Sequence, residues 1–550
     1  YMPSFFQSKN SHNQKNIATW VGTLALTLSV GACGGGSYSH STSDESNNKD
    51  VVITKYGKIQ GITADSKTSF KGIPFAQPPI GPLRWVPPQE PKPWEHVLKA
   101  DTFGNDCMQL RPLHARSTGM SENCLYLNVY KPSSAKPGDK LPVHVWIYGG
   151  AFANGSASDP RFDNPPDVDA GIIYVNFNYR VNAFGFIAHP GLTAESPNKA
   201  SGNYGLMDQI AALKWVRDNI EQFGGDPGMV TISGESAGAA SIGYLIQSPL
   251  STGLFKRAIL ESTFGFHPQR TLAQQEELMT QTFGGDIQEL RKKSAADILK
   301  ILPGNGIETT GGIFGFQDWA PIVDGNVLRQ SDRQAWKDGN FQKIDMMIGD
   351  NENEGATFLA IGGLQALPTD KRKPEEFRNF LREQYGDLAD KALAIYPANN
   401  DNEVLWQLAM AYGDSWFQYS SREMSRLMMK HKPNVYRYVF SKHAAQPRML
   451  GDRPAAGHTD EIPYIFGSVK AGDKYSTSDV ATSLAFVDAK QRFIKTGNPN
   501  GGKLGATWPQ YDATDPYLEF GDNGQKAGSG YRNNAYDLVT EYLNKNIPLK

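Results

Sequence analysis

The sequence predicts an α/β fold whose mainly parallel central sheet is covered by helices on both faces. From residue 141 on, short runs of β-branched and aromatic residues end in glycine or polar residues, and helical patterns follow them. Strands that alternate with helices in this way form a parallel sheet with both faces covered. The sequence shows no internal repeat and no second composition regime, so residues 51–550 are predicted to form one large domain.

Short apolar segments in this region are predicted as strands. They are residues 142–148, 171–178, 229–233, 257–261, 344–348 and 435–440. Residues 206–222 are predicted as a helix, because apolar residues recur from Leu206 onward with the helical period. Residues 270–300 and 370–430 are predicted as helical insertions.

The residues before 141 show a different sequence pattern. Residues 51–61 alternate in polarity and end in glycine, which predicts a hairpin-like opening. Residues 72–94 contain eight prolines. Because proline lacks an N–H and its φ angle is fixed, this density excludes a regular helix or a central strand there.

The composition excludes several classes of protein. The 550 residues include 55 Lys and Arg and 57 Asp and Glu, a formal net charge of −2, which argues against a nucleic-acid partner. A hydrophobic content of 39% with 20% charged residues is typical of a globular protein with a large core. No stretch reaches the ~18 apolar residues of a membrane span. Disordered, fibrous and polytopic membrane proteins are therefore excluded.

The N-terminal residues have the layout of an export signal. Two lysines precede an apolar run over residues 17–30, and small residues lead directly to Cys33. Because this resembles the lipobox of bacterial lipoproteins, residues 1–32 are predicted as a lipoprotein-type signal peptide with Cys33 as the lipidated residue. An ordinary signal peptide is the alternative. Residues 33–50, which contain almost no apolar side chain, are predicted as a flexible tether.

We therefore expect an exported protein that associates with a membrane through lipid on Cys33. Its expected place is the outer membrane of a Gram-negative bacterium, or otherwise the periplasm or the extracellular space. In such an oxidising compartment the remaining cysteines, Cys107 and Cys124, are expected to form a disulfide. Two buried free thiols are the alternative.

Ser236 is the centre of the strongest motif. The run Gly234-Glu235-Ser236-Ala237-Gly238 lies between a predicted strand and an apolar helix. A Gly-x-Ser-x-Gly match alone is weak, but a strand-to-helix turn needs the glycines, because a Cβ would crowd the strained serine. The turn lifts the hydroxyl clear of the sheet and places helix N-terminal N–H groups behind it. Ser236 is predicted as a nucleophile, with a helix N-cap serine as the alternative.

A serine nucleophile needs a base, and in this arrangement the chain order is Ser, acid, His. His431 and His443 lie in lysine-flanked stretches typical of a solvated surface, whereas His458 lies in a small, glycine-containing loop. His458 is therefore predicted as the base. Glu461 is interpreted as a supporting carboxylate or a helix-start residue.

The acid of the triad is expected after the predicted strand 344–348. Asp350, Glu352 and Glu354 are all candidates by position, and a carboxylate there would orient His458 and stabilise its imidazolium. Position alone does not choose among them, and three solvated loop acids are the alternative.

The oxyanion formed during acyl transfer is expected to bind to two groups of backbone N–H donors. Ala237, which follows the nucleophile, supplies the first. Gly149 and Gly150, which directly follow the predicted strand 142–148, supply the second, because residues without a Cβ let the backbone approach the reacting carbonyl. A simple turn is the alternative for these glycines. The expected chemistry needs no metal and no cofactor.

Together these residues resemble the type-B carboxylesterase and cholinesterase family of α/β hydrolases, over nearly the whole mature chain. The family-like blocks are Phe70-Lys71-Gly72-Ile73-Pro74-Phe75-Ala76, Ser121-Glu122-Asn123-Cys124-Leu125-Tyr126-Leu127-Asn128-Val129, Asn178-Tyr179-Arg180-Val181, Gly202-Asn203-Tyr204-Gly205-Leu206-Met207-Asp208-Gln209, Phe223-Gly224-Gly225-Asp226-Pro227, Gly497-Asn498-Pro499-Asn500 and Trp508-Pro509-Gln510-Tyr511.

The resemblance implies an α/β-hydrolase fold with helical insertions around an active-site gorge. It also implies that Glu354 is the acid, because a glycine and an aromatic-containing helix follow it. The family's first disulfide implies a Cys107–Cys124 bond, and Ser262 is implied as a supporting residue near the triad. The oxyanion donors that it implies are the three backbone N–H groups already named.

Two departures from the family bear on the substrate. The 16 residues between Cys107 and Cys124 include no Trp, the residue with which cholinesterases hold a quaternary ammonium by cation–π attraction. Choline esters are therefore poor candidates. Tyr148 stands where many relatives have His or another residue, a difference that bears on the alcohol side of the pocket.

The sequence therefore predicts a serine carboxylesterase that hydrolyses small-molecule esters through an acyl-enzyme. A lipase or polyester hydrolase is the alternative, and the complete triad disfavours a non-enzymatic surface-binding protein of the same fold. Phe152, Phe316 and Trp319 are predicted to line the substrate pocket, with core packing as the alternative.

Overall fold

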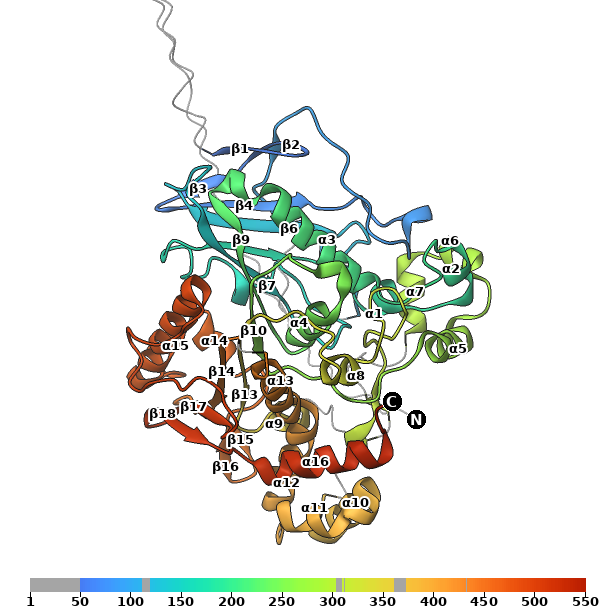
Figure 1. Cartoon of the computed structure of the whole chain (residues 1–550). Helices are drawn as coiled ribbons and strands as arrows, with labels where there is room; N and C mark the ends of the chain where they lie inside the picture. The colour runs from blue at the N-terminus through green and yellow to red at the C-terminus, as the bar shows by residue number, and fades with distance from the viewer. Residues whose placement is uncertain (1–49, 111–118, 303–308, 311, 361–371, 432) are drawn as a thin grey trace, which may run out of the picture. The chain divides into compact units, whose positions relative to one another are not determined.

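Figure 1 shows a central sheet with helices on its two sides. The computed structural model describes residues 50–110, 119–302, 309–310, 312–360, 372–431 and 433–550. The predicted signal peptide, the predicted lipidation site Cys33 and the tether up to residue 49 lie outside these residues. Residues Asp50–Lys550 make up one compact unit.

The sheet has 11 strands in the order β18-β17-β14-β13-β10-β9-β7-β8-β6-β4-β3. Their bounds are β3 (Ile62–Ala64), β4 (Lys67–Pro74), β6 (Tyr126–Pro132), β7 (Leu141–Ile147), β8 (Ile173–Phe177), β9 (Gly225–Glu235), β10 (Arg257–Glu261), β13 (Asp345–Asn351), β14 (Val435–Phe440), β17 (Pro516–Gly521) and β18 (Gly524–Ser529). From β8 to β17 in this order, neighbouring strands pair in parallel. The pairs at both ends of the sheet are antiparallel. The predicted mainly parallel sheet is confirmed.

All six predicted strands are present as β7, β8, β9, β10, β13 and β14, and they are neighbours in the sheet. The remaining strands of the sheet were not predicted from the sequence; they are β3, β4, β6, β17 and β18. Of these, β4 contradicts the prediction for residues 72–74, which form its last residues. Pro74 ends the strand, and the register shifts between Phe70 and Ile73, so the proline interrupts no continuous ladder.

The helices follow the predicted pattern. The longer ones are α3 (Tyr204–Asn219), α4 (Ala237–Gln247), α5 (Leu272–Phe283), α10 (Pro374–Tyr385), α12 (Asp401–Gly413), α13 (Tyr419–Met429), α15 (Thr477–Thr496) and α16 (Asn533–Asn546). The shorter ones are α1 (Asn182–Phe186), α2 (Pro190–Glu195), α6 (Ile287–Lys292), α7 (Ala295–Ile301), α8 (Asp332–Lys337), α9 (Gly355–Ala360), α11 (Ala389–Ile395) and α14 (Ile462–Ile465). The two predicted insertions contain α5 to α7 and α10 to α13.

Helices cover both faces of the sheet. Helices α3 and α4 pack against β9, α13 packs against β13 and β14, and α15 packs against β7 and β9. Figure 1 shows α14 and α15 on one side of the strands and α4 and α13 on the other. Because both faces are covered, a strand such as β10 is buried along its whole length.

Three smaller sheets complete the strand set. They contain β1 (Val51–Thr54), β2 (Gly57–Gln60) and β5 (Leu98–Lys99); β11 (Thr309–Thr310) and β12 (Phe316–Gln317); and β15 (Arg448–Leu450) and β16 (Arg453–Ala455). Strands β1 and β2 form the predicted hairpin-like opening. Cys107 and Cys124 form a disulfide with their Cα atoms 5.0 Å apart. Within the described ranges, no helix has the length and apolar character of a membrane span.

The register of the parallel strands places four of their carboxyl ends at one edge of the sheet. Ile147 of β7 pairs with Gly234 of β9, which pairs with Leu260 of β10, and Leu260 pairs with Ile348 of β13. The loops that follow these strands therefore meet there. In open α/β sheets this edge is where active sites are built.

Candidate active site

Ser236 lies between the end of β9 and the first residue of α4. Its backbone has φ 57° and ψ −125°, a conformation that costs a non-glycine residue about 1–3 kcal/mol. Its N–H donates to the carbonyl oxygen of Glu261 on the neighbouring strand, at 3.0 Å. A Cβ on Gly238 would lie 2.0 Å from the carbonyl oxygen of Ile147. The glycine is therefore required for the turn to pass this closely over β7.

His458 contacts Glu354 through its Nδ1 atom. The distance from Nδ1 to Glu354 Oε2 is 2.6 Å, and both side chains are buried. The other carboxylate oxygen, Oε1, accepts hydrogen bonds from Ser262 Oγ at 2.7 Å and from the Asn351 N–H at 2.6 Å. A carboxylate held in this way fixes the ring with the proton on Nδ1, so Nε2 carries the lone pair of a base. Ser262 lies where the resemblance implied, beside the acid.

The other candidate acids contact different partners. Asp350 Oδ1 accepts a hydrogen bond from Ser421 Oγ at 2.7 Å, and Glu352 Oε2 lies 3.0 Å from His443 Nε2. Of the three candidates, Glu354 is the one placed beside His458. His443 is held between Glu352 and Asp522, which separates it from the end of β9.

Glu461 anchors the loop that carries His458. Its Oε2 atom accepts a short hydrogen bond from Asn351 Nδ2, which also donates to the carbonyl oxygen of Gly457 at 2.6 Å. Glu461 is the N-cap residue of α14, so it lies at the start of that helix, but its side chain makes no cap hydrogen bond there. Burial, together with the charges of Glu235 and Glu354, raises the pKa of Glu461 well above its ordinary value.

Glu235 is a site residue that the sequence analysis did not identify. Its Oε1 atom lies 3.1 Å from His458 Nε2, without hydrogen-bond geometry. Burial raises the pKa of Glu235 to about 7, against the opposing charge of His458. Burial lowers the pKa of His458, but the charge of Glu235 and the hydrogen bond that His458 donates to Glu354 outweigh this effect, so the pKa is raised overall. The sequence does offer a sign of this role, because Glu235 is a carboxylate directly before Ser236, just after the predicted strand 229–233.

The predicted oxyanion donors surround the serine. A Cβ on Gly149 would lie 2.9 Å from Ser236 Cβ, so this backbone passes directly beside the nucleophile. Gly150 has φ 122°, which a residue with a side chain rarely adopts. Among the hydrogen bonds of the described residues, none is donated by the N–H of Gly149 or Gly150. Ala237 opens α4, where N–H groups have no partner within the helix.

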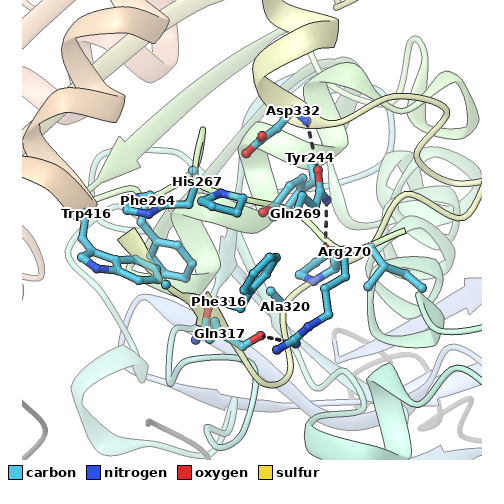
Figure 2. A pocket seen from close by; sticks show the side chains of 15 residues that line it. Tyr244, Phe264, His267, Gln269, Arg270, Phe316, Gln317, Ala320, Asp332 and Trp416 are labelled. Carbon is cyan, nitrogen blue, oxygen red and sulfur yellow. Dashed lines mark hydrogen bonds between the residues drawn. The ribbon is translucent and has the colours of Figure 1, made fainter. Parts of the chain in front are cut away.

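A pocket lies close to these residues, and Figure 2 shows its lining side chains. Phe316 is among them. Trp319 and Phe152 are fully buried and do not line this pocket. The Trp319 ring packs 6.5 Å from that of Phe283, and the Phe152 ring lies 6.0 Å from that of Phe264, a lining residue. The surroundings of Trp319 and Phe152 are those of core side chains, which was the alternative interpretation of these residues.

Tyr148 faces away from the reacting atoms. Its ring stacks on that of Tyr179 with centroids 4.5 Å apart, and its hydroxyl donates to the Tyr179 carbonyl oxygen at 3.0 Å. The Tyr148 side chain is buried. Its departure from the family pattern therefore changes the packing behind the Gly149–Gly150 turn.

Comparison with known proteins identifies the family. The model of the carboxylesterase family matches residues 48–539. The fumonisin B1 esterase of Sphingopyxis macrogoltabida is 37% identical over 531 residues, which cover 93% of this chain and 94% of the relative. The para-nitrobenzyl esterase of Bacillus subtilis is 33% identical over 488 residues, covering 84% and 92%. The chain therefore belongs to the carboxylesterase family of α/β hydrolases and is a carboxylic ester hydrolase.

Proposed function

We propose that this chain is a serine carboxylesterase that cleaves carboxylic esters through an acyl-enzyme, with Ser236, His458 and Glu354 as its triad. The observation that carries the proposal is the 2.6 Å contact between His458 Nδ1 and Glu354 Oε2, at the sheet edge where Ser236 follows β9. A neutral imidazole whose Nδ1–H is held by a carboxylate has its basic Nε2 atom free for the serine proton.

In the first half of the reaction, Ser236 Oγ attacks the ester carbonyl carbon and its proton passes to His458 Nε2. The carbonyl oxygen becomes an oxyanion that accepts hydrogen bonds from the N–H groups of Gly149, Gly150 and Ala237. One such donor is worth about 3 kcal/mol of barrier. The tetrahedral intermediate collapses, the carbon–oxygen bond to the alcohol breaks, and His458 returns its proton to the leaving alkoxide.

In the second half, water takes the place of the alcohol. His458 removes a proton from the water as it attacks the acyl carbon, and the second tetrahedral intermediate releases the carboxylic acid. The proton on His458 returns to Ser236 Oγ. The buried carboxylates of Glu354 and Glu235 stabilise the imidazolium in both halves, because Coulomb attraction is stronger in a buried site than in water.

Replacement of the nucleophile tests the triad. Ser236→Ala is expected to lose hydrolysis of p-nitrophenyl acyl esters while keeping the circular dichroism spectrum and Tm of the wild type. Ser468→Ala, at an exposed serine, is the matched control and is expected to keep full activity. An organophosphonate is expected to add to Ser236, as read by mass spectrometry. A Ser236→Ala variant with the wild-type rate would overturn the assignment.

We also propose that the protein is exported and carries a diacylglycerol on Cys33. The apolar run and small residues before Cys33 support this, and the Cys107–Cys124 disulfide suits an oxidising compartment. In a Gram-negative host the full chain is expected in the membrane fraction, and Cys33→Ser in the soluble fraction. The wild-type protein is expected to show no thiol under denaturing, non-reducing conditions, and one free thiol would contradict lipidation.

A further inference from the structure

The pocket of Figure 2 is linked to the proposed catalytic residues by contacts through Ala151 and Phe417. Gln317 Nε2 donates to the carbonyl oxygen of Ala151, at 3.0 Å, within the turn that begins with Gly149. On the other side, the Phe264 ring lies 5.8 Å from that of Phe417, whose ring lies 4.6 Å from His458. A group bound in this pocket would therefore belong to the same substrate that reaches Ser236.

His267 presents an unpaired hydrogen-bond acceptor at this pocket. Its Nε2 atom lies 2.9 Å from the carbonyl oxygen of Ser415. Because a carbonyl oxygen only accepts, Nε2 carries the proton and Nδ1 has the lone pair. Burial lowers the pKa of His267 to about 4, so the ring is neutral at pH 7. Nδ1 is buried and, within the described residues, without a partner, while the ring is held by stacking on Trp416 at 4.0 Å.

Gln317 presents a second unpaired acceptor. Its amide nitrogen is committed to Ala151, which fixes the orientation of the amide group. Its Oε1 atom is buried and likewise has no partner among the residues that the structure describes. In Figure 2 the Phe264 and Trp416 rings lie at one side of the pocket and Arg270 at the other, with His267 and Phe316 between them.

Three other polar side chains of the pocket have hydrogen-bond partners. Gln269 Oε1 accepts from the Asp332 N–H at 3.1 Å, and its Nε2 donates to the Pro321 carbonyl oxygen at 2.9 Å. The Asp332 carboxylate accepts from the N–H groups of Phe266 and Arg333. Arg270 Nη1 donates to the Gln317 carbonyl oxygen at 3.2 Å. Two acceptors of the lining side chains, His267 Nδ1 and Gln317 Oε1, have no donor among the residues that the structure describes.

We propose that this pocket is a subsite for a hydroxyl group of the ester substrate, which donates a hydrogen bond to His267 Nδ1. The proposal rests on the proposed function and names a substrate class for it, hydroxylated esters. An ionised carboxylate has no proton to donate to these acceptors, and an ammonium would meet the positive charge of Arg270. The free space of about 30 Å³ admits only a small group.

A set of matched esters tests this subsite. Esters that bear one hydroxyl at successive carbons, first of the acyl group and then of the alcohol group, are each compared with the isostere that has a methyl group instead. At one or more positions, kcat/KM of the wild-type enzyme is expected to be about tenfold higher for the hydroxylated ester, the worth of one hydrogen bond. The series in which kcat/KM rises, acyl-hydroxylated or alcohol-hydroxylated, identifies which part of the ester enters the pocket.

A variant links the gain to His267. His267→Phe keeps an aromatic ring against Trp416 and removes the acceptor, so the preference for the hydroxylated ester is expected to fall to about one. His96→Phe, at an exposed histidine, is the matched control and is expected to keep the wild-type ratio. The wild-type comparison decides the matter even if His267→Phe does not fold.

The two proposals fail in different ways. If the wild type hydrolyses the methyl esters through Ser236 but prefers no hydroxylated ester at any position, the subsite proposal is overturned and the serine esterase stands. If Ser236→Ala keeps the wild-type rate, the proposed function itself fails. If His267→Phe keeps the wild-type ratio of kcat/KM between the hydroxylated ester and the methyl ester, the hydroxyl binds elsewhere and the subsite proposal is overturned.

Discussion

Glu235 Oε1 and His458 Nε2 lie 3.1 Å apart, on the side of the imidazole ring opposite to its contact with Glu354. His458 is thus placed between two buried carboxylates, one on each ring nitrogen. Glu354 is fixed by two further hydrogen bonds, whereas Glu235 approaches without hydrogen-bond geometry. The two carboxylates therefore have different roles: Glu354 orients the ring, and Glu235 acts on it through its charge.

Glu235→Gln is expected to move the acidic limb of the pH–rate profile to lower pH. The charge of Glu235 raises the pKa of His458 against the lowering effect of burial, so removal of this charge lowers that pKa. His458 must be neutral to act as a base, and it then remains neutral at lower pH. The measurement is kcat/KM for a p-nitrophenyl ester from pH 4 to pH 9.

The control for this profile is Glu221→Gln, at an exposed carboxylate in the 3₁₀ turn Ile220–Phe223. It is expected to leave the acidic limb in place. An unchanged limb in Glu235→Gln as well would show that the charge of Glu235 does not reach His458.

Glu354→Gln is expected to lower kcat by about 10⁴-fold with little change in KM. The substitution keeps the size of the side chain but removes the charge that holds the Nδ1–H tautomer and stabilises the imidazolium. Glu352→Gln, in the same loop, contacts His443 instead and is the matched control. Equal activity of the two variants would exclude Glu354 as the acid of the triad.

Gly238→Ala is expected to destabilise the fold, because the new Cβ would lie 2.0 Å from the carbonyl oxygen of Ile147. Overpacking against backbone costs about 3 kcal/mol, which thermal or urea unfolding measures. Gly285→Ala is the control, since a Cβ there meets nothing within 4 Å. If both variants unfold at the same temperature, the turn does not pass as closely over β7 as the structure indicates.

Glu461→Gln is expected to stabilise the protein at alkaline pH more than at pH 5. The pKa of Glu461 is raised in the folded state, so its contribution to stability is complete below its unfolded pKa of about 4.3 and falls as the pH rises above it. Gln cannot ionise and still offers an acceptor to Asn351. The difference in Tm from the wild type is measured at pH 5 and pH 9.

Glu289→Gln, at an exposed carboxylate on α6, is expected to show no such difference between the two pH values. A Glu461→Gln variant whose Tm differs from the wild type equally at pH 5 and pH 9 would mean that Glu461 has an ordinary pKa in the folded protein.

The sequence alone determined the parallel centre of the sheet and the positions of Ser236 and His458. Each depends on local patterns: apolar runs that mark buried strands, glycines that a tight turn requires, and loop composition around a histidine. Strands β4 and β6 were missed because polar residues interrupt their apolar patterns and, in both, the strand ends in proline. Residue order also left Asp350, Glu352 and Glu354 as equal candidates until the family resemblance pointed to one.

Only the tertiary structure decided which side chains meet. Glu354 contacts His458, Glu352 contacts His443, and Asp350 contacts Ser421. Yet each of these acids is only two residues from the next along the chain. The direction of each side chain depends on segments distant in sequence, and no local periodicity encodes it. For the same reason, sequence reasoning found Ser236 but not its neighbour Glu235, whose part in the site arises only where the loop of His458 folds back over β9.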